Sequence, residues 1–445
     1  MLASELPSMA NLRPDFIWGV STSSFQIEGA AKEDGRGPSI WDTYCQNGEV
    51  KNHDTGDVAC DHYHRYREDV ALMKLLGVQA YRFSVAWPRV LPQGRGSANE
   101  PGLAFYDRLI DELLAAGIEP WLCLYHWDLP QALEDLGGWM NRESAAWFAD
   151  YTTLVATRFG DRVKRFATFN EPSIFTLFGR SIGKRDRSSE DNLHRTIHHV
   201  NLAHGAAVDV LRQGVPDASI GCIHSYQPCR PFGTGDADAA AAVRLSTYWN
   251  NAFPDPQCRG EYPSSLRTAI APHIQPGDMA RICRPVDWFG LNHYSPVYVK
   301  AQATSMLGLK IGDNPAGIRL TPIDWPIDPE AFSEALRIVD ERYGLPIYVL
   351  ENGYGSYDKP DPAGAVIDTD RIGFLRAYIA ALNAAASDGV DVRGYFIWSL
   401  LDNFEWDSGY SIRFGLTYVD YSSLRRIPKS SFNWYKDLIK TARRR

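Results

Sequence analysis

The chain has 445 residues, of which 44% are hydrophobic and 22% are charged, and its formal net charge is −8 at pH 7. This composition is typical of a soluble globular protein with a large core. The negative charge argues against a nucleic-acid or anionic-membrane partner, because either would need a basic surface. Thirteen tryptophans suit either a large core or the apolar faces of sugars, and the composition favours neither reading.

The compartment is predicted from the cysteines and from the absence of apolar runs. Seven cysteines form an odd set without C-x-x-C spacing, which favours free thiols in a reducing compartment over a disulfide framework or a zinc site. No apolar run approaches the roughly 18 residues of a membrane helix, and the N-terminus lacks the pattern of a signal peptide. We therefore expect a cytoplasmic protein.

Short apolar runs rich in β-formers recur along the chain and predict eight strands. They cover residues 16–20, 80–84, 120–125, 165–169, 219–223, 287–291, 347–350 and 394–398. Most of them are separated by a helical pattern. From Phe105 to Ala116, for example, apolar residues recur at helical spacing and Gly117 marks a stop. Strand and helix alternating eight times predict an α/β fold, a (β/α)8 barrel.

The chain is predicted to form one domain. No low-complexity linker or break in composition divides it, so residues 1–445 fit a single barrel with enlarged βα loops. Residues 1–13 are expected to be a flexible N-terminal extension. The stretches 181–192 and 301–322 are the best candidates for long exposed loops.

Two of the predicted strands stop at a glutamate beside an asparagine. Pro172 disfavours the helical region at Glu171 and predicts an extended strand end there. Gly353 would let the chain turn away after Glu351. Two carboxylates at the ends of distant strands are what a paired-carboxylate active site requires, and hydrolysis of a glycosidic bond is the best-known chemistry of such a pair.

Barrel active sites lie at the carboxyl ends of the strands, where this sequence places polar and aromatic residues. Such a ring suits a neutral polyhydroxylated ligand better than a phosphate or a metal. Arg82 lies inside an apolar strand and should have a carboxylate partner, because an unpaired buried charge is costly. The ring consists of Gln26, Glu28, Arg82, His126, Trp127, Asp128, Asn170, Glu171, Asn292, His293, Tyr294, Glu351, Trp398, Glu405 and Trp406.

Motifs for cofactors are not found. The sequence has no G-x-G-x-x-G and no phosphate-binding P-loop, so a nucleotide cofactor has no support. The histidines of residues 61–64 and 198–199 lack H-E-x-x-H spacing, so no metal site is predicted. The expected partner is a small molecule.

The chain resembles the family 1 glycoside hydrolases, the β-glucosidase family, over nearly its whole length. The resemblance rests on residues 16–29, 125–130, 168–172, 351–353 and 402–406. It implies a single catalytic (β/α)8 barrel without a cofactor, and release of terminal β-D-glucosyl residues from cellobiose-like oligosaccharides and from aryl or alkyl β-glucosides, with retention. Alternatives are a β-galactosidase or β-fucosidase of the same family, and a catalytically silent sugar-binding protein.

The resemblance also implies roles for individual residues. Glu171 would be the acid/base and Glu351 the nucleophile, with their carboxyl groups about 5–5.5 Å apart. Ionised Glu351 would raise the pKa of Glu171, while Arg82 and Tyr294 would keep Glu351 ionised. The other substrate-binding positions are Gln26, His126, Trp127, Asn170, Asn292, Trp398, Glu405 and Trp406, with Trp325 on the leaving-group side.

The sequence departs from the family pattern at four places. Ser173 stands where tryptophan is usual, Asp324 where glycine is frequent and Ile412 where lysine is frequent. A charged stretch at 184–187 replaces a loop that commonly reads Ala-Pro-Gly. These places lie mainly at the cleft entrance or on the leaving-group side, so the sequence does not determine which leaving group is preferred.

Two related activities of the family fit less well. A 6-phospho-β-glycosidase would need a basic phosphate pocket, whereas the residues expected there are Glu405 and Trp406. A thioglucosidase of the plant type lacks the acid, and here Glu171 is present.

Overall fold

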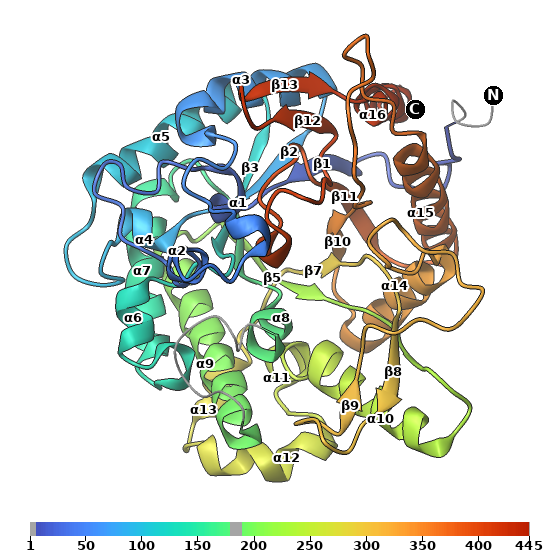
Figure 1. The fold of residues 1–445 in the computed structure, drawn as a ribbon. Helices are drawn as coiled ribbons and strands as arrows, with labels where there is room; N and C mark the ends of the chain where they lie inside the picture. Colours follow the sequence, from blue (N-terminus) through green and yellow to red (C-terminus); the bar gives the residue numbers. More distant parts are fainter. Residues whose placement is uncertain (1–5, 179–188, 445) are drawn as a thin grey trace.

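The computed structural model describes residues 6–178 and 189–444, and eight parallel strands in it close into a barrel (Figure 1). The strands follow one another around the barrel in chain order, and β11 pairs with β1 to close it. Each predicted strand is confirmed. The strands are β1 (Ile17–Ser21), β2 (Ala80–Ser84), β3 (Glu119–Tyr125), β4 (Arg165–Asn170), β5 (Ser219–Ser225), β7 (Trp288–Asn292), β10 (Ile347–Asn352) and β11 (Val392–Trp398).

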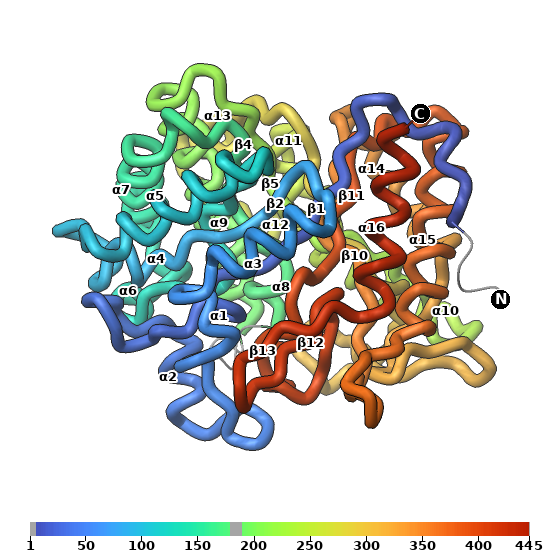
Figure 2. The backbone as a smooth tube through the Cα atoms, turned by 90° about the horizontal axis from the view of Figure 1, so that it is seen from above, coloured from blue at the N-terminus to red at the C-terminus, as the bar shows by residue number. Residues whose placement is uncertain are grey.

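Helices surround the barrel (Figures 1 and 2). The helix predicted from Phe105 begins earlier, at Glu100, because Pro101 is tolerated in a first turn; it ends just before Gly117, whose φ is +75°. Four shorter helices follow β5. The outer helices are α3 (His62–Leu76), α5 (Glu100–Ala115), α7 (Ser144–Phe159), α9 (Glu190–Gly214), α11 (Pro254–Arg259), α12 (Ser264–Ile270), α13 (Asp278–Ile282), α14 (Pro329–Tyr343), α15 (Thr369–Ser387) and α16 (Ser430–Ala442), while α10 (Asp236–Ser246) packs on short strands outside the barrel.

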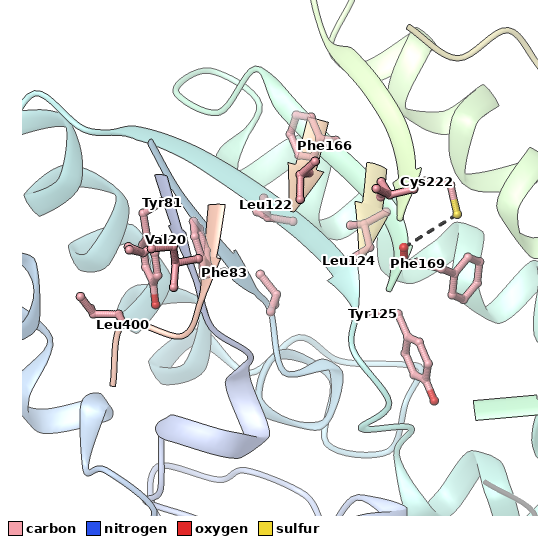
Figure 3. Close-up of a cluster of buried hydrophobic side chains, with 14 of the residues drawn as sticks. Val20, Tyr81, Phe83, Leu122, Leu124, Tyr125, Phe166, Phe169, Cys222 and Leu400 are labelled. Carbon is pink, nitrogen blue, oxygen red and sulfur yellow. Dashed lines mark hydrogen bonds between the residues drawn. The ribbon is translucent and has the colours of Figure 1, made fainter. Parts of the chain in front are cut away.

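Alternate side chains of the barrel strands belong to two apolar layers, as the period of a strand requires. Leu122 and Leu124 of β3 pack in one cluster with Phe83 of β2 and Phe166 of β4, in the layer shared with the helices (Figure 3). Trp121 of the same strand belongs to a second cluster, to which every strand of the barrel contributes and which fills its interior.

Aromatic rings fill the barrel interior, and glycines make room for them. The ring of Trp121 lies 5.4 Å from that of Trp288 and 5.2 Å from that of Phe396, centroid to centroid. A Cβ at Gly221 would lie 2.4 Å from the indole of Trp288, and one at Gly19 would lie 2.3 Å from Phe396. The barrel is therefore a packed core, and a ligand can enter only at its end.

Short elements in the βα loops build the region above the barrel. The predicted loop at 301–322 is mostly irregular, whereas residues 190–192 of the other predicted loop begin α9 and residues 181–188 lie outside the described part. The short elements include α1 (Ser24–Ile27), α2 (Ile40–Gln46), α4 (Trp87–Val90), α6 (Gln131–Asp135), α8 (Pro172–Leu177), the sheet of β6 (Cys229–Pro231), β8 (Val297–Ala301) and β9 (Leu309–Lys310), and the hairpin of β12 (Thr417–Asp420) and β13 (Arg425–Pro428).

Part of the predicted N-terminal extension is packed. Met9 is buried in the core cluster, and the backbone N–H of Asn11 donates to Oδ1 of Asn383 in α15 at 3.0 Å. The extension therefore joins the barrel from about Met9 onward, while residues 1–5 lie outside the described part. The cysteines are all free thiols, as predicted. Among the helices described, none has the length and hydropathy needed to cross a bilayer.

Candidate active site

Glu171 occupies a sharp turn between strand β4 and helix α8. Its backbone is left-handed, with φ +49° and ψ 62°, and its N–H donates to the carbonyl of Ile223 at 2.8 Å. The extended end predicted at Glu171 is therefore wrong. Pro172 excludes the right-handed helical region, as expected, but the chain uses the left-handed region to turn from strand into helix. The turn places the carboxyl group of Glu171 in the wall of a cavity.

Glu351 is still part of strand β10, where it lies in register with Asn292 of β7. Gly353 does not have the positive φ of a glycine turn. Its role is different from the one predicted, because a Cβ there would lie 2.0 Å from the carbonyl oxygen of Trp398. The missing side chain lets the chain after β10 approach the end of β11 at Trp398.

Two donors hold the carboxylate of Glu351. Arg82 donates from Nη1 to Oε1 at 2.7 Å, and the hydroxyl of Tyr294 donates to Oε2 at 2.7 Å. The carboxylate partner expected for Arg82 is thus Glu351. The other arm of the guanidinium, Nη2, donates to Oδ1 of Asn170.

The amide of Asn292 connects Glu171 to Asn170. Its Nδ2 donates to Oε1 of Glu171 at 2.9 Å and lies 3.0 Å from Oδ1 of Asn170. Asn170 also accepts from Arg82, which donates to Glu351, so polar contacts run from one glutamate to the other.

The surroundings of the two glutamates separate their acidities. Burial and then the negative charge of Glu351 raise the pKa of Glu171 to about 8. Burial also raises the pKa of Glu351, but the charge of Arg82 and the hydrogen bond from Tyr294 oppose that rise. Glu351 is consequently the stronger acid, and at neutral pH the pair holds its proton on Glu171.

Another part of the site is built by Gln26 and the loop after β11. Nε2 of Gln26 donates to the carbonyl of Phe404 at 2.8 Å, to Oδ1 of Asn403 at 3.1 Å and to Oε2 of Glu405 at 3.4 Å. Burial, followed by the charge of Glu351, raises the pKa of Glu405 to about 8. Asn403 holds Gln26 in place, a role that its position between Asp402 and Glu405 did not indicate.

Aromatic rings form one wall. The ring centroid of His126 lies 5.8 Å from that of Trp398 and 5.9 Å from that of Trp406, both stacked, and Trp127 lies 4.6 Å from Trp406. Burial and the nearby charge of Arg82 lower the pKa of His126 well below its usual value, so its imidazole is neutral.

The cavity has a volume of about 550 Å³. Trp325, which is 38% exposed, stands at its mouth with its ring 5.3 Å from that of Tyr294. Four expected side chains lie beneath the wall and bond to residues of the site: Gln26, Arg82, Asn170 and Asn292. The other expected side chains line it: His126, Trp127, Glu171, Tyr294, Trp325, Glu351, Trp398, Glu405 and Trp406.

Comparison with known proteins identifies the family. The sequence model of glycosyl hydrolase family 1 matches residues 8–444. The chain belongs to this family. It is accordingly a hydrolase of glycosidic bonds that retains the anomeric configuration.

Relatives match along nearly the whole chain. Beta-glucosidase A of Thermotoga maritima is 43% identical over 434 residues, which cover 96% of this chain and 97% of the relative. The 1,4-beta-D-glucan glucohydrolase of Thermotoga neapolitana is 42% identical over 434 residues, again 96% of this chain and 97% of the relative. The solved structure of beta-glucosidase from Thermotoga maritima in complex with glucoimidazole has a TM-score of 0.91 and 42% identity, covering 97% of this chain and 99% of that one.

The departures from the family 1 pattern have different surroundings. Ser173 is buried in the first turn of α8, and Ile412 is half-buried. Asp324 is exposed at the cavity mouth with a left-handed φ of +62°. Residues 184–187 lie outside the described part of the chain.

Besides the four side chains beneath the wall, three further members of the predicted ring do not line the cavity. Glu28 is paired with Arg89 at 2.8 Å, and Asp128 accepts a hydrogen bond from the hydroxyl of Ser24 at 2.8 Å. Nδ1 of His293 lies 2.9 Å from a backbone carbonyl oxygen. These three side chains lie one or two positions from a site residue along the chain but contact other parts of the protein, so adjacency in sequence overestimated the ring.

The mouth of the cavity contains residues that the sequence did not indicate. They come from loops and short elements, where no strand end marks them. No sequence pattern marks these residues, because they come together only through the packing of the βα loops. These residues include Ile174, Phe178, Gln227, Trp249, Tyr298, Ile311, Asp313, Asn314 and Phe414.

The sequence predicted no metal site. Within residues 6–178 and 189–444, no cluster of three or more His, Cys, Asp or Glu side chains is arranged to hold an ion. The histidines weighed in the sequence have protein partners: His62 lies 2.8 Å from Asp69, and His198 lies 2.8 Å from Asp278.

Proposed function

We propose that this family 1 enzyme is a β-glucosidase that releases terminal non-reducing β-D-glucosyl residues from cellobiose-like oligosaccharides and from aryl or alkyl β-glucosides. The observation that carries the proposal is the pair Glu171 and Glu351, in which Asn292 donates to Glu171 while Arg82 and Tyr294 donate to Glu351. The names of the relatives support glucose as the sugar. We further propose that the whole chain works as a single catalytic domain in the cytoplasm, where its free thiols would stay reduced.

In the first step Glu351 attacks the anomeric carbon while Glu171 protonates the departing glycosidic oxygen. The carbon–oxygen bond breaks and a covalent glycosyl-enzyme forms. In the second step a water molecule gives its proton to Glu171 and attacks the same carbon. Glu351 leaves as a carboxylate, and two inversions produce net retention.

The change in the role of Glu171 follows from its neighbour. While Glu351 is ionised, its charge raises the pKa of Glu171, so Glu171 begins as an acid. Esterification removes that charge, the pKa of Glu171 falls, and the same carboxylate accepts the proton of water. Arg82 and Tyr294 stabilise Glu351 when it leaves as an anion.

The sugar is recognised by the buried end of the cavity. Glu405 and Gln26, with His126 and Trp406, provide acceptors and donors for hydroxyl groups, and Trp398 is an apolar floor for the ring. Asn170 is assigned to the 2-hydroxyl, a contact that strengthens in the transition state. Trp127 completes the aromatic wall, and Trp325 lies on the leaving-group side.

The proposal is tested by initial rates on p-nitrophenyl β-glucoside, β-galactoside and β-fucoside, with cellobiose as the oligosaccharide. We expect hydrolysis of the glucoside and of cellobiose. Replacement of Glu351 by Gln should lower kcat by about 10⁴-fold or more, as loss of a nucleophile does in covalent catalysis. A clear preference for the galactoside or fucoside would correct the sugar, and binding without hydrolysis of any substrate would refute the proposal.

A further inference from the structure

A second cavity of about 210 Å³ adjoins the first. We call it the side cavity. It shares Trp127, Ile174, Phe178 and Trp406 with the wall of the reaction cavity, so the two spaces meet along these side chains. None of the steps proposed above uses it. The rest of its wall is formed by Ile40, Trp41, Tyr125, Leu129, Glu134, Trp139, Phe175 and Asp407.

The wall of the side cavity is mostly aromatic and packed. The ring of Trp139 lies 5.2 Å from Tyr125 and 6.1 Å from Phe175, and that of Trp41 lies 4.5 Å from Trp406. Nε1 of Trp139 donates to the hydroxyl of Tyr125 at 3.3 Å, so these two polar groups are already engaged with each other. Such a wall favours an apolar occupant over a polar one.

The position of the acid directs a leaving group toward this cavity. Glu171 immediately precedes α8 and protonates the departing oxygen, so the leaving group lies on the side of that helix. Ile174 of the same helix and Phe178 just beyond it line both cavities, while Phe175 lines the side cavity alone. A chain that continued from the departing oxygen along α8 would run toward the side cavity.

We propose that the side cavity binds the apolar tail of the leaving group, which makes alkyl β-glucosides with several carbons a preferred substrate class. The inference rests on the proposed β-glucosidase activity. Burial of one methylene contributes about 0.8 kcal/mol, which corresponds to roughly fourfold in kcat/KM if the full contact is formed. The gain should stop at the chain length that reaches the end of the side cavity.

The test measures kcat/KM for methyl, butyl, hexyl and octyl β-glucosides below the concentrations at which they form micelles. We expect a rise of two- to fourfold per methylene over part of the series, followed by a plateau. In Phe175→Gln the dependence on chain length should flatten, whereas Phe175→Leu, which keeps the wall apolar, should restore it. Each variant is compared with its own rate on methyl β-glucoside.

A matched control is Ile311→Gln, which places the same polar group on a part of the reaction cavity that is not shared with the side cavity. This variant should keep the rise with chain length. If Ile311→Gln flattens the series and Phe175→Gln does not, the tail lies along the other wall and the inference is wrong. A flat series in the native enzyme overturns it as well.

A second measurement needs no variant. 1-Hexanol should raise the KM for hexyl β-glucoside more than the KM for methyl β-glucoside, because only the longer substrate competes for the side cavity. Equal effects on both would contradict the inference. Rapid hydrolysis of methyl β-glucoside with a flat series overturns this inference alone, whereas no hydrolysis of any β-glucoside overturns the proposed function and this inference with it.

Discussion

Arg82 and Glu351 form a buried ion pair, with Nη1 of the guanidinium 2.7 Å from Oε1 of the carboxylate. The pair joins strand β2 to strand β10 across the end of the barrel. Burial alone would raise the pKa of Glu351 and favour its protonated form, and the charge of Arg82 opposes this rise and favours the ionised carboxylate that acts as nucleophile. The acidity of Glu351 thus depends on a residue from a distant part of the chain.

Replacement of Arg82 by Met should shift the acid limb of kcat/KM toward higher pH. Without the guanidinium the pKa of Glu351 rises further, and only ionised Glu351 attacks. Dinitrophenyl β-glucoside is the suitable substrate, since its leaving group needs little help from Glu171. Arg65→Met, at a surface pair with Glu68, serves as control and should leave the limb in place. An unchanged acid limb in Arg82→Met would count against the assigned pair.

On substrates with a poor leaving group, kcat/KM should fall as the pH rises through about 8. Glu171 must be protonated to assist departure, and its pKa is raised to about 8. The measurement compares the pH profiles for cellobiose and dinitrophenyl β-glucoside. We expect the fall to be much weaker with the dinitrophenyl substrate. A basic limb below pH 6 with cellobiose would contradict the assignment of Glu171 as the acid.

Glu171→Gln should stabilise the fold, and more so at pH 8 than at pH 5. The folded state holds the proton of Glu171 up to about pH 8, whereas the unfolded chain releases it near 4.5. The folded state therefore binds more protons between these values, and Glu171 lowers the free energy of unfolding as the pH rises. Glutamine does not titrate. Thermal melting at both pH values measures the difference, and an equal change in Tm at both would contradict it.

Gly353→Ala should reduce stability and activity together. The new Cβ would lie 2.0 Å from the carbonyl oxygen of Trp398, and relief of such overpacking typically costs about 1–3 kcal/mol. It would also push apart the ends of strands β10 and β11, which carry Glu351 and Trp398. Gly373→Ala in α15 is the matched control: its Cβ meets no atom within 4 Å, and a helical alanine adds up to about 1 kcal/mol. Denaturant unfolding and kcat distinguish the two.

The barrel could be predicted from the sequence because its strands are short local patterns. The apolar runs around Leu122 and Val349, for example, have the length and residue types of strands whatever surrounds them. The two glutamates could be found for the same reason, as polar residues at the ends of such runs. Strand ends of a parallel barrel converge by geometry, so position along the chain predicted position in space.

Other features depend on packing between distant loops. The left-handed turn at Glu171 results from how β4 must meet α8, and Pro172 restricted that backbone without fixing it. The hydrogen bond from Gln26 to Asn403 joins residues 377 positions apart. The side cavity lies between α2, α6 and α8, and its presence depends on how these helices pack, which local sequence patterns do not predict.

Azide rescue of the two glutamate variants tests the central claim most directly. In Glu351→Gly, azide should enter the space left by the nucleophile and give the α-glycosyl azide by a single inversion. In Glu171→Ala with an activated aryl β-glucoside, Glu351 still forms the intermediate, and azide should give the β-glycosyl azide. The anomeric configuration is read by NMR of the products. We predict α for Glu351→Gly and β for Glu171→Ala; the reverse would contradict the roles assigned to the pair.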